Sequence, residues 1–230
     1  MVKKVGKPKT IIISLISTFA ALNIIADIFP FTPVLGAPGA YFRFGWVLAP
    51  LTGILLGPVE GGVSCIIASL IELFLGFQTW NFGVFSPFRA GLSAFQSGLL
   101  VKGKWKIAAT ILGGLIFIWV LLPTGREALS VLSFHLIGFI LILFFRSSIG
   151  RYMDSSVWRK VMLSIAIATY CGNISRHLFG NTILAIIANL PPIYFISAIP
   201  FTLVEQITFT AATTIIGAAL TRTRLREFIK

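Results

Sequence analysis

The chain has 230 residues, of which 57% are hydrophobic and only 11% are charged, and its mean hydropathy is +0.95. A soluble domain carries about 25% charged residues because water must wet its surface, so this composition excludes an ordinary soluble domain and favours an integral membrane protein. The net charge of +12 does not indicate nucleic-acid binding, because the basic residues stand in short clusters between apolar runs.

Apolar runs along the whole chain predict membrane-spanning helices. A spanning helix needs about 20 apolar residues, and the first run, after a lysine-rich start, is interpreted as a retained helix. We therefore predict one integral membrane domain over 1–230, an all-α polytopic bundle of about six to eight helices. The seventh run allows one long bent helix or a span followed by a turn. The predicted segments are about 10–30, 43–57, 59–76, 86–101, 107–122, 129–146, 161–188 and 193–220.

Lysine and arginine are distributed unequally between the two predicted sides of the membrane. With eight alternating spans that start in the cytoplasm, 15 of the 19 basic residues fall on the cytoplasmic side. The other four are Arg43, Arg89, Arg126 and Arg176. Because cytoplasmic loops accumulate lysine and arginine, we predict cytoplasmic amino and carboxyl termini and a multi-pass cell-membrane location.

A glycine pattern marks the junction of the second and third segments. Gly53, Gly57 and Gly61 recur every four residues, and such spacing lets two helix backbones approach closely. Pro58 interrupts the pattern, and proline is tolerated in the first turn of a helix. The second segment should therefore end near Gly57 and the third should start at Pro58, as a tight helical hairpin.

Several stretches around this hairpin resemble one transporter family. They are Leu-Leu-Gly-Pro-x-x-Gly at 55–61, Gly-Trp-Val-Leu-Ala-Pro at 45–50, Ile-Ala-Ser-Leu-Ile-Glu at 67–72, and Ala-Ile-Pro-Phe-Thr-Leu-Val-Glu at 198–205. On these motifs the chain resembles the S-components of energy-coupling factor (ECF) transporters, the substrate-binding membrane subunits of vitamin and micronutrient importers. The resemblance implies cytoplasmic termini and an outward-facing cavity capped by outer loops. It also implies a coupling membrane subunit and ATPase subunits as partners.

The chain departs from the family pattern at two places. The family typically has six helices, and the additional pair predicted here falls between 107 and 160. The family's first helix often carries an Ala-x-x-x-Ala contact for the coupling subunit, where this chain has Ser17 and Ala21 four residues apart. These two residues are the predicted partner contact.

Polar side chains inside the apolar segments point to a substrate site, because charges in a bilayer are costly. Asp27, Glu72, Arg89 and Arg176 fall near the outer ends of their segments. A cluster in the seventh segment has spacings of three and four, which places it on one helix face. We predict a pocket for a small vitamin-like molecule. Its predicted residues are Glu72, Trp80, Asn81, Arg89, Asn173, Arg176, His177 and Asn181.

Each of these residues also has a structural interpretation. Outer-end charges can snorkel to the lipid headgroups, and Trp80 can belong to the interfacial aromatic belt. His135, alone on an apolar face, favours a hydrogen bond between helices. Glu205 and Gln206 fit either a contact between helices or a site. Cys65 and Cys171 lie in apolar runs and are interpreted as small buried hydrophobes.

Catalytic and cofactor motifs give little indication of an enzyme. The sequence contains no H-E-x-x-H, no C-x-x-C and no Walker loop, so we predict no enzyme activity, no metal and no cofactor, and we assign ATP hydrolysis to partners. The alternative is a self-contained secondary transporter or channel that couples ions through Asp27, Glu72 and Glu205. A third class is an intramembrane enzyme, for which 91–94 (Gly-Leu-Ser-Ala) with a histidine is a faint pattern.

Overall fold

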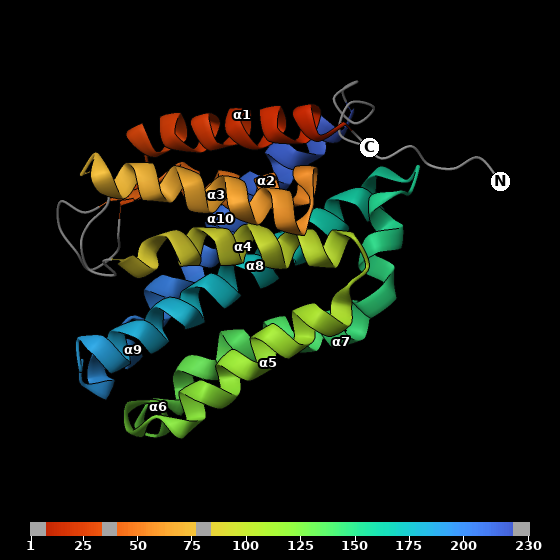
Figure 1. The fold of residues 1–230 in the computed structure, drawn as a ribbon. Helices are drawn as coiled ribbons and strands as arrows, with labels where there is room; N and C mark the ends of the chain where they lie inside the picture. The colour runs from red at the N-terminus through yellow and green to blue at the C-terminus, as the bar shows by residue number, and fades with distance from the viewer. Residues whose placement is uncertain (1–7, 34–40, 77–83, 223–230) are drawn as a thin grey trace.

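The computed structural model describes residues 8–33, 41–76 and 84–222 (Figure 1). Almost all of these residues are helical, and every predicted apolar segment contains one long helix. The long helices are α1 (Lys9–Ile28), α2 (Gly45–Leu56), α3 (Pro58–Phe74), α4 (Ser86–Val101), α5 (Trp105–Leu121), α7 (Leu132–Met153), α8 (Trp158–Ile187) and α10 (Ile199–Arg222). The short ones are α6 (Pro123–Glu127), η2 (Leu129–Val131) and α9 (Pro192–Ser197).

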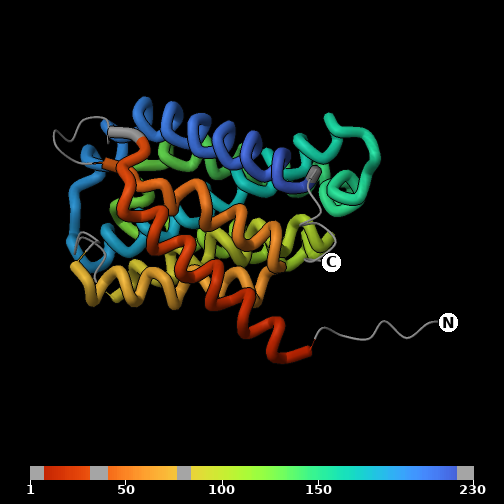
Figure 2. Tube along the Cα trace, turned by 90° about the horizontal axis from the view of Figure 1, so that it is seen from above, coloured from red at the N-terminus to blue at the C-terminus, as the bar shows by residue number. Residues whose placement is uncertain are grey.

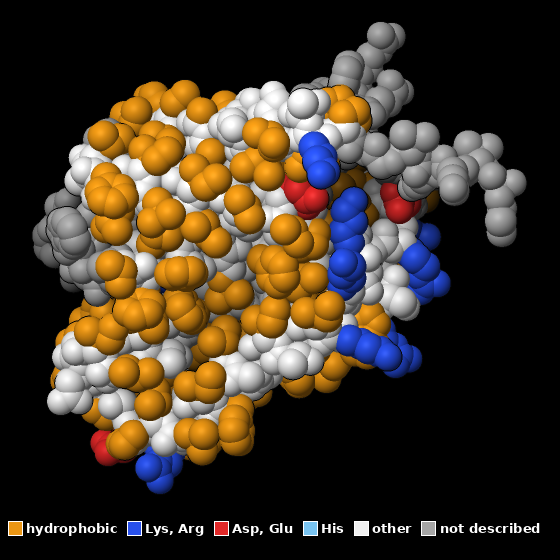
Figure 3. Space-filling model, in the orientation of Figure 1, with side chains coloured by type: hydrophobic (Ala, Val, Ile, Leu, Met, Phe, Trp, Pro, Cys, Tyr) orange, Lys and Arg blue, Asp and Glu red, His pale blue; other side chains and the backbone are white. Residues whose placement is uncertain are grey.

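Three helices are long and apolar enough to cross a membrane, by length and composition. They are Lys9–Ile28, the stretch Leu129–Met153 that contains α7, and Ile199–Thr221. Large apolar side chains also cover much of the outer surface in Figure 3, where a soluble protein would expose charges. The chain is therefore a helical bundle whose surface and longest apolar helices suit a lipid environment.

A small hairpin of two strands, which was not predicted, is added to the predicted helical bundle. β1 (Pro30–Pro33) pairs antiparallel with β2 (Tyr41–Arg43), with an irregular register between Pro30 and Thr32. Prolines at both ends of β1 lack the amide hydrogen that a helix interior needs, so helix α1 cannot continue through this stretch. Phe44 extends the pairing by donating its amide to the carbonyl oxygen of Phe29, at 3.1 Å.

Helix boundaries differ from the predicted segments at three places. The seventh segment is one helix of 30 residues, α8, which settles the two alternatives for it. The eighth is divided into α9 and α10. Helix α7 extends to Met153, but its backbone is non-helical at Arg146, so a kink lies at the predicted end and a further helical stretch follows it.

Helix α8 lies in the interior of the bundle. It packs against α2, α4, α5, α7 and α10, while α1 packs against α2 and α3 at the edge. Figure 2 shows α1 crossing the bundle obliquely, with α10 on the opposite side from α3 and α4. Sixteen of the thirty residues of α8 are buried, polar ones included, so this helix positions the internal polar groups.

The predicted hairpin at the glycine pattern is confirmed. Helix α2 ends at Leu56, Gly57 has a φ of 105° that favours glycine, and α3 starts at Pro58. A side chain on Gly61 would lie 2.6 Å from the Cα atom of Gly53, so these two backbones touch. Helix α4 joins them, since a side chain on Gly98 would lie 2.6 Å from the Pro58 nitrogen.

Candidate functional site

Four charged side chains are buried or nearly so around one end of the bundle, the end where the β1–β2 hairpin lies. Asp27 is in the last turn of α1, Glu72 in the last turn of α3 and Arg89 in the first turn of α4. Arg176 comes from the middle of α8 and reaches the same region. Glu72 is 2% exposed, Arg89 8% and Arg176 7%. Because exposed charges snorkel to water and these do not, the snorkelling interpretation fails for these three residues.

A small cavity of about 10 Å³ joins three of the four charges, and it comes close to the size that holds one water molecule. The carboxyl groups of Asp27 and Glu72 are close enough to share a hydrogen bond, and Arg176 interacts electrostatically with both. Apart from the charges, its walls are small or polar side chains. The lining residues are Asn23, Asp27, Gly45, Ala49, Cys65, Ala68, Ser69, Glu72, Ala90 and Arg176.

Trp46, near the start of α2, lies between the two buried arginines and an aromatic cluster. The guanidinium carbon of Arg176 lies 3.6 Å from the centre of the Trp46 ring, and that of Arg89 lies at 5.3 Å. The ring also contacts Phe42 of β2 and Phe209 of α10, at centroid distances of 4.8 and 5.6 Å. Electron-rich aromatic faces attract cations, so Trp46 holds both guanidinium groups under the hairpin.

Hydrogen bonds fix the hairpin and α2 to the end of α1. Arg43 of β2 donates from Nη1 to the backbone carbonyl oxygen of Asp27, at 2.6 Å. The amide of Gly45 donates to the Asp27 carboxylate at 3.0 Å. One turn earlier, the side-chain amide of Asn23 donates to the Thr52 hydroxyl at 3.0 Å. Asp27 therefore both lines the cavity and anchors β2 and the start of α2.

The polar residues of α8 do not all face this cavity, although their spacing predicts one face. Asn173 accepts a hydrogen bond of 2.9 Å from Ser93 of α4, and its amide nitrogen has no hydrogen-bond partner among the described residues. The same holds for Nε of Arg176. Two buried donor atoms thus face the interior between α4, α2 and α8 without an acceptor.

His177 and Asn181 lie on another side of α8, towards α7 and α10. Nδ1 of His177 is 3.2 Å from Nε2 of His135, so the predicted helix-to-helix role of His135 is confirmed. Asn181 Nδ2 and Thr202 Oγ1 each lie 3.5 Å from a His177 ring nitrogen. These residues form a second polar group that does not line the charged cavity, although His177 interacts electrostatically with Arg89.

The remaining predicted residues have simple placements. Trp80 and Asn81 lie outside the described residues. Ser17 and Ala21 are both exposed on α1, and the Ser17 hydroxyl donates to the carbonyl oxygen of Ile13. Glu205 and Gln206 are buried on α10, at 9% and 2% exposure, and this burial is compatible with both interpretations given above.

Sequence reasoning left Asp27 out of the predicted site and did not single out Trp46 or Asn23. Asn23 and Asp27 are four residues apart and therefore share a face of α1. This spacing could have predicted that Asn23 and Asp27 belong to one site. Nothing local to Trp46 marks it, because its role depends on two arginines that are distant in sequence.

The described residues offer little for catalysis or metal binding. Within residues 8–33, 41–76 and 84–222, no three side chains of His, Cys, Asp or Glu converge in a metal-binding group. The Ser93 hydroxyl donates to Asn173 rather than to a histidine, so the 91–94 pattern has no base paired with its serine. The arrangement instead groups cations and carboxyls around a space close to the size of one water molecule, with the Trp46 ring against both arginines.

Comparisons with known proteins identify one relative. An uncharacterized protein of Methanocaldococcus jannaschii is 30% identical over 171 residues, which are 74% of this chain and 56% of that protein. The chain thus matches little more than half the length of this relative, which brings no assigned activity with it. No family model matches the chain. No solved structure matches it either.

Proposed function

We propose that the chain is the substrate-capturing membrane subunit of an ECF-type importer. In this proposal it is a multi-pass protein of the cell membrane with both termini in the cytoplasm. It binds a small vitamin-like molecule from outside, and a coupling subunit and ATPase subunits drive uptake. The observation that carries the proposal is the buried group of Asp27, Glu72, Arg89 and Arg176 around Trp46. Charges in a bilayer interior are costly and are retained for function.

The position of this group supports capture from outside. The charged cavity lies at the end of the bundle with the β1–β2 hairpin, whereas the lysine-rich connection between α4 and α5 lies at the opposite end (Figure 1). Basic connections mark the cytoplasmic side. The hairpin is held by Arg43 and Gly45 at the rim and therefore has the place of an outer cover.

The first experiment isolates the tagged protein from native membranes in mild detergent. We expect ATPase subunits and a second membrane protein to co-purify, and a small molecule to be extractable from the same sample. Arg176→Lys removes the planar guanidinium but keeps the charge, so we expect the extracted molecule to fall at least tenfold while partners remain. The matched control is Arg126→Gln, outside the cluster, which should leave the extracted molecule unchanged.

A second variant separates partner contact from capture. Ala21→Phe adds bulk to the exposed face of α1 and should reduce co-purified partners while the small molecule stays bound. Leu22→Phe, equally exposed on a neighbouring face, should change neither. If the wild-type protein repeatedly emerges alone and empty, the importer proposal is wrong.

The interacting pair of carboxyls, Asp27 and Glu72, favours a second candidate, a self-contained secondary transporter or channel. Buried carboxyls beside a cation are groups through which such proteins couple to ions. Reconstitution of the chain alone in vesicles with a trapped pH-sensitive dye tests this candidate. Proton or ion movement that Asp27→Asn abolishes would support it, and tight vesicles would count against it.

A further inference from the structure

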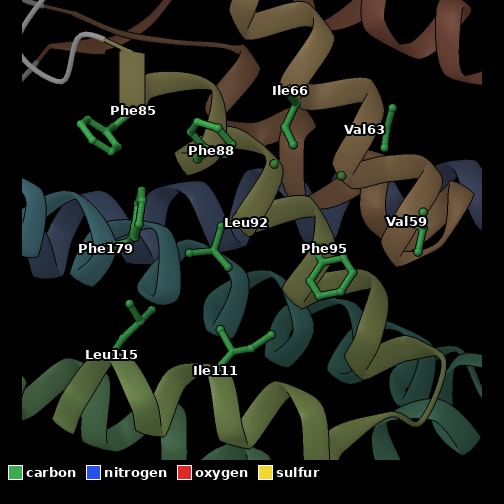
Figure 4. A pocket seen from close by; sticks show the side chains of 12 residues that line it. Val59, Val63, Ile66, Phe85, Phe88, Leu92, Phe95, Ile111, Leu115 and Phe179 are labelled. Carbon is green, nitrogen blue, oxygen red and sulfur yellow. The ribbon is translucent and has the colours of Figure 1, made fainter. Parts of the chain in front are cut away.

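A large apolar groove opens on the face of the bundle formed by α3, α4 and α5 (Figure 4). Its volume is about 640 Å³, and it is separate from the charged cavity. Val59 and Ile66 of α3, Phe88, Leu92 and Phe95 of α4, and Ile111 of α5 face it. Carbon surface makes up nearly all of its walls, so a solute with polar groups along its length would leave those groups unpaired.

The groove exists because α3 and α4 touch while α5 leans away. A side chain on Gly91 would lie 3.2 Å from the carbonyl oxygen of Gly62, so the two helices meet at these glycines, and the Ile66 side chain packs directly over Gly91. Figure 1 shows α5 diverging from α4 beyond their connection. Large side chains rather than small ones form the rim.

The length of the groove matches one leaflet of a bilayer. Val59 to Ile66 on α3 and Phe88 to Phe95 on α4 each cover seven residue steps, or about 10 Å at about 1.5 Å per residue. Phe85 extends the lining beyond Phe88. A bilayer's hydrocarbon core is about 30 Å thick, so one leaflet is about 15 Å. A single acyl chain that enters from one interface would therefore fill the groove.

One end of the groove is positively charged. Lys102, Lys104 and Lys106 are exposed in and beside the connection between α4 and α5, the two helices that form its floor and one wall. Lys102 reaches the turn before Val59, because its Cε lies 3.7 Å from the position of a side chain on Gly57. Glu60 is the acidic residue at this turn. The other end is lined by the aromatic side chains of Phe85 and Phe88. The lysines therefore lie at one end of the groove only.

We propose that the groove binds one acyl chain of an anionic phospholipid whose phosphate lies against Lys102, Lys104 and Lys106. The lysines supply the charge that a phosphate requires, and the carbon walls cover the chain below it. Trp105 lies between these lysines, where tryptophan commonly marks the interface of a bilayer. The proposal requires that the bundle lie in a membrane, and it does not depend on substrate capture or on partner subunits.

Native mass spectrometry of the full chain in detergent tests the head-group contact. We expect one tightly bound lipid and a roughly tenfold preference for phosphatidylglycerol over phosphatidylcholine. The triple variant Lys102→Gln, Lys104→Gln, Lys106→Gln should lose the preference. The matched triple variant Arg151→Gln, Arg159→Gln, Lys160→Gln, at the α7–α8 connection, should keep it. An equal preference in both triple variants would overturn the proposal.

A groove-filling substitution tests the acyl-chain contact. Leu92→Trp places an indole in the floor of the groove and should weaken binding of both lipids at least tenfold. Ile140→Trp, on an exposed face of α7, is the matched control and should bind like the wild type. A photoreactive amino acid at position 92 then identifies the occupant in native membranes. A lipid adduct supports the proposal, and a protein adduct shows that a partner helix occupies the groove instead.

Discussion

Two regions of the bundle are packed in different ways. Helices α2, α3 and α4 meet backbone to backbone, with Gly53, Gly61 and Gly98 at their contacts. Helices α5, α7 and α8 meet through large apolar side chains, and Leu112, Ile142 and Ile174 are fully buried there. In the first region the helices are close and nothing can be added. In the second region the contacts depend on the volume of the buried side chains, so removing that volume leaves a cavity.

The difference teaches where each region gets its stability. Lipid is as apolar as leucine, so association in a membrane depends on close packing rather than on hiding apolar surface from water. Glycine contacts provide this by bringing backbones together, and large side chains provide it by filling the space between helices. The charged site lies beside the first region, where the short distance between backbones holds Glu72 and Arg89 in place.

The largest expected effect comes from adding one methyl group to the first region. In Gly53→Ala the new Cβ would overlap the carbonyl oxygen of Ala94, and backbone on both sides cannot move aside. We expect a loss of about 3 kcal/mol or more in stability, measured by thermal unfolding in detergent. Gly114→Ala on α5 is the control, because nothing lies within 4 Å of its Cβ position. Gly114→Ala should increase stability by about 0.5 kcal/mol, because alanine has a higher helix propensity than glycine. Equal melting temperatures for Gly53→Ala and Gly114→Ala would contradict the proposed close backbone packing of the first region.

A cavity in the second region should have the next largest effect. Trp119 is fully buried against Phe195, at a centroid distance of 5.2 Å. Trp119→Ala should cost about 3 kcal/mol. Trp119→Phe should cost less than half of that, because it keeps most of the ring and removes an indole N–H that has no hydrogen-bond partner among the described residues. The same unfolding assay compares them, and a harmless Trp119→Ala would contradict dense packing in this region.

The smallest effect concerns a hydrogen bond that attaches α10 to the first region. Thr213 donates to the carbonyl oxygen of Val47 at 2.9 Å and is fully buried. Thr213→Val keeps the shape and should cost about 0.6 kcal/mol, as is usual between membrane helices. Thr208→Val is the control, since its hydroxyl bonds only within α10 on an exposed face. A loss of stability above 2 kcal/mol for Thr213→Val would show that the packing of α10 depends strongly on this hydrogen bond.

Much of the helical framework could be predicted because its signals are local. Apolar runs located all eight long helices, and Gly57-Pro58 located the junction of α2 and α3 to the residue. The β1–β2 hairpin was not predicted, because its pairing joins residues that are not adjacent in sequence, in a proline-rich stretch that resembles an irregular connection. Helix α9 was missed for a similar reason, since it lies within an apolar run that continues into α10.

The site was predictable in part. Glu72, Arg89 and Arg176 could be selected because charge in an apolar run is conspicuous, and the cavity and Trp46 bring them into one region. His177 and Asn181 do not line this cavity, because neighbouring positions on an interior helix contact different helices on its flanks. Spacing predicts which residues share one side of a helix, and the neighbouring helices determine what each of those residues contacts.

The contact between His135 and His177 also imposes a direction. The carbonyl oxygen of Val131 can only accept, so Nδ1 of His135, 2.8 Å away, carries hydrogen. In a neutral ring, Nε2 of His135 must then accept, and Nδ1 of His177 must donate to it. The Asn181 amide, whose Nδ2 lies 3.5 Å from the same Nδ1, must then present its oxygen to this nitrogen. Nε2 of His177 is left as the acceptor that faces the Thr202 hydroxyl. The carbonyl oxygen of Val131 in η2 thereby determines which ring nitrogens carry hydrogen in α7 and α8. The hydrogen bonds that link α10, α8 and α7 then all donate in the same direction, towards η2.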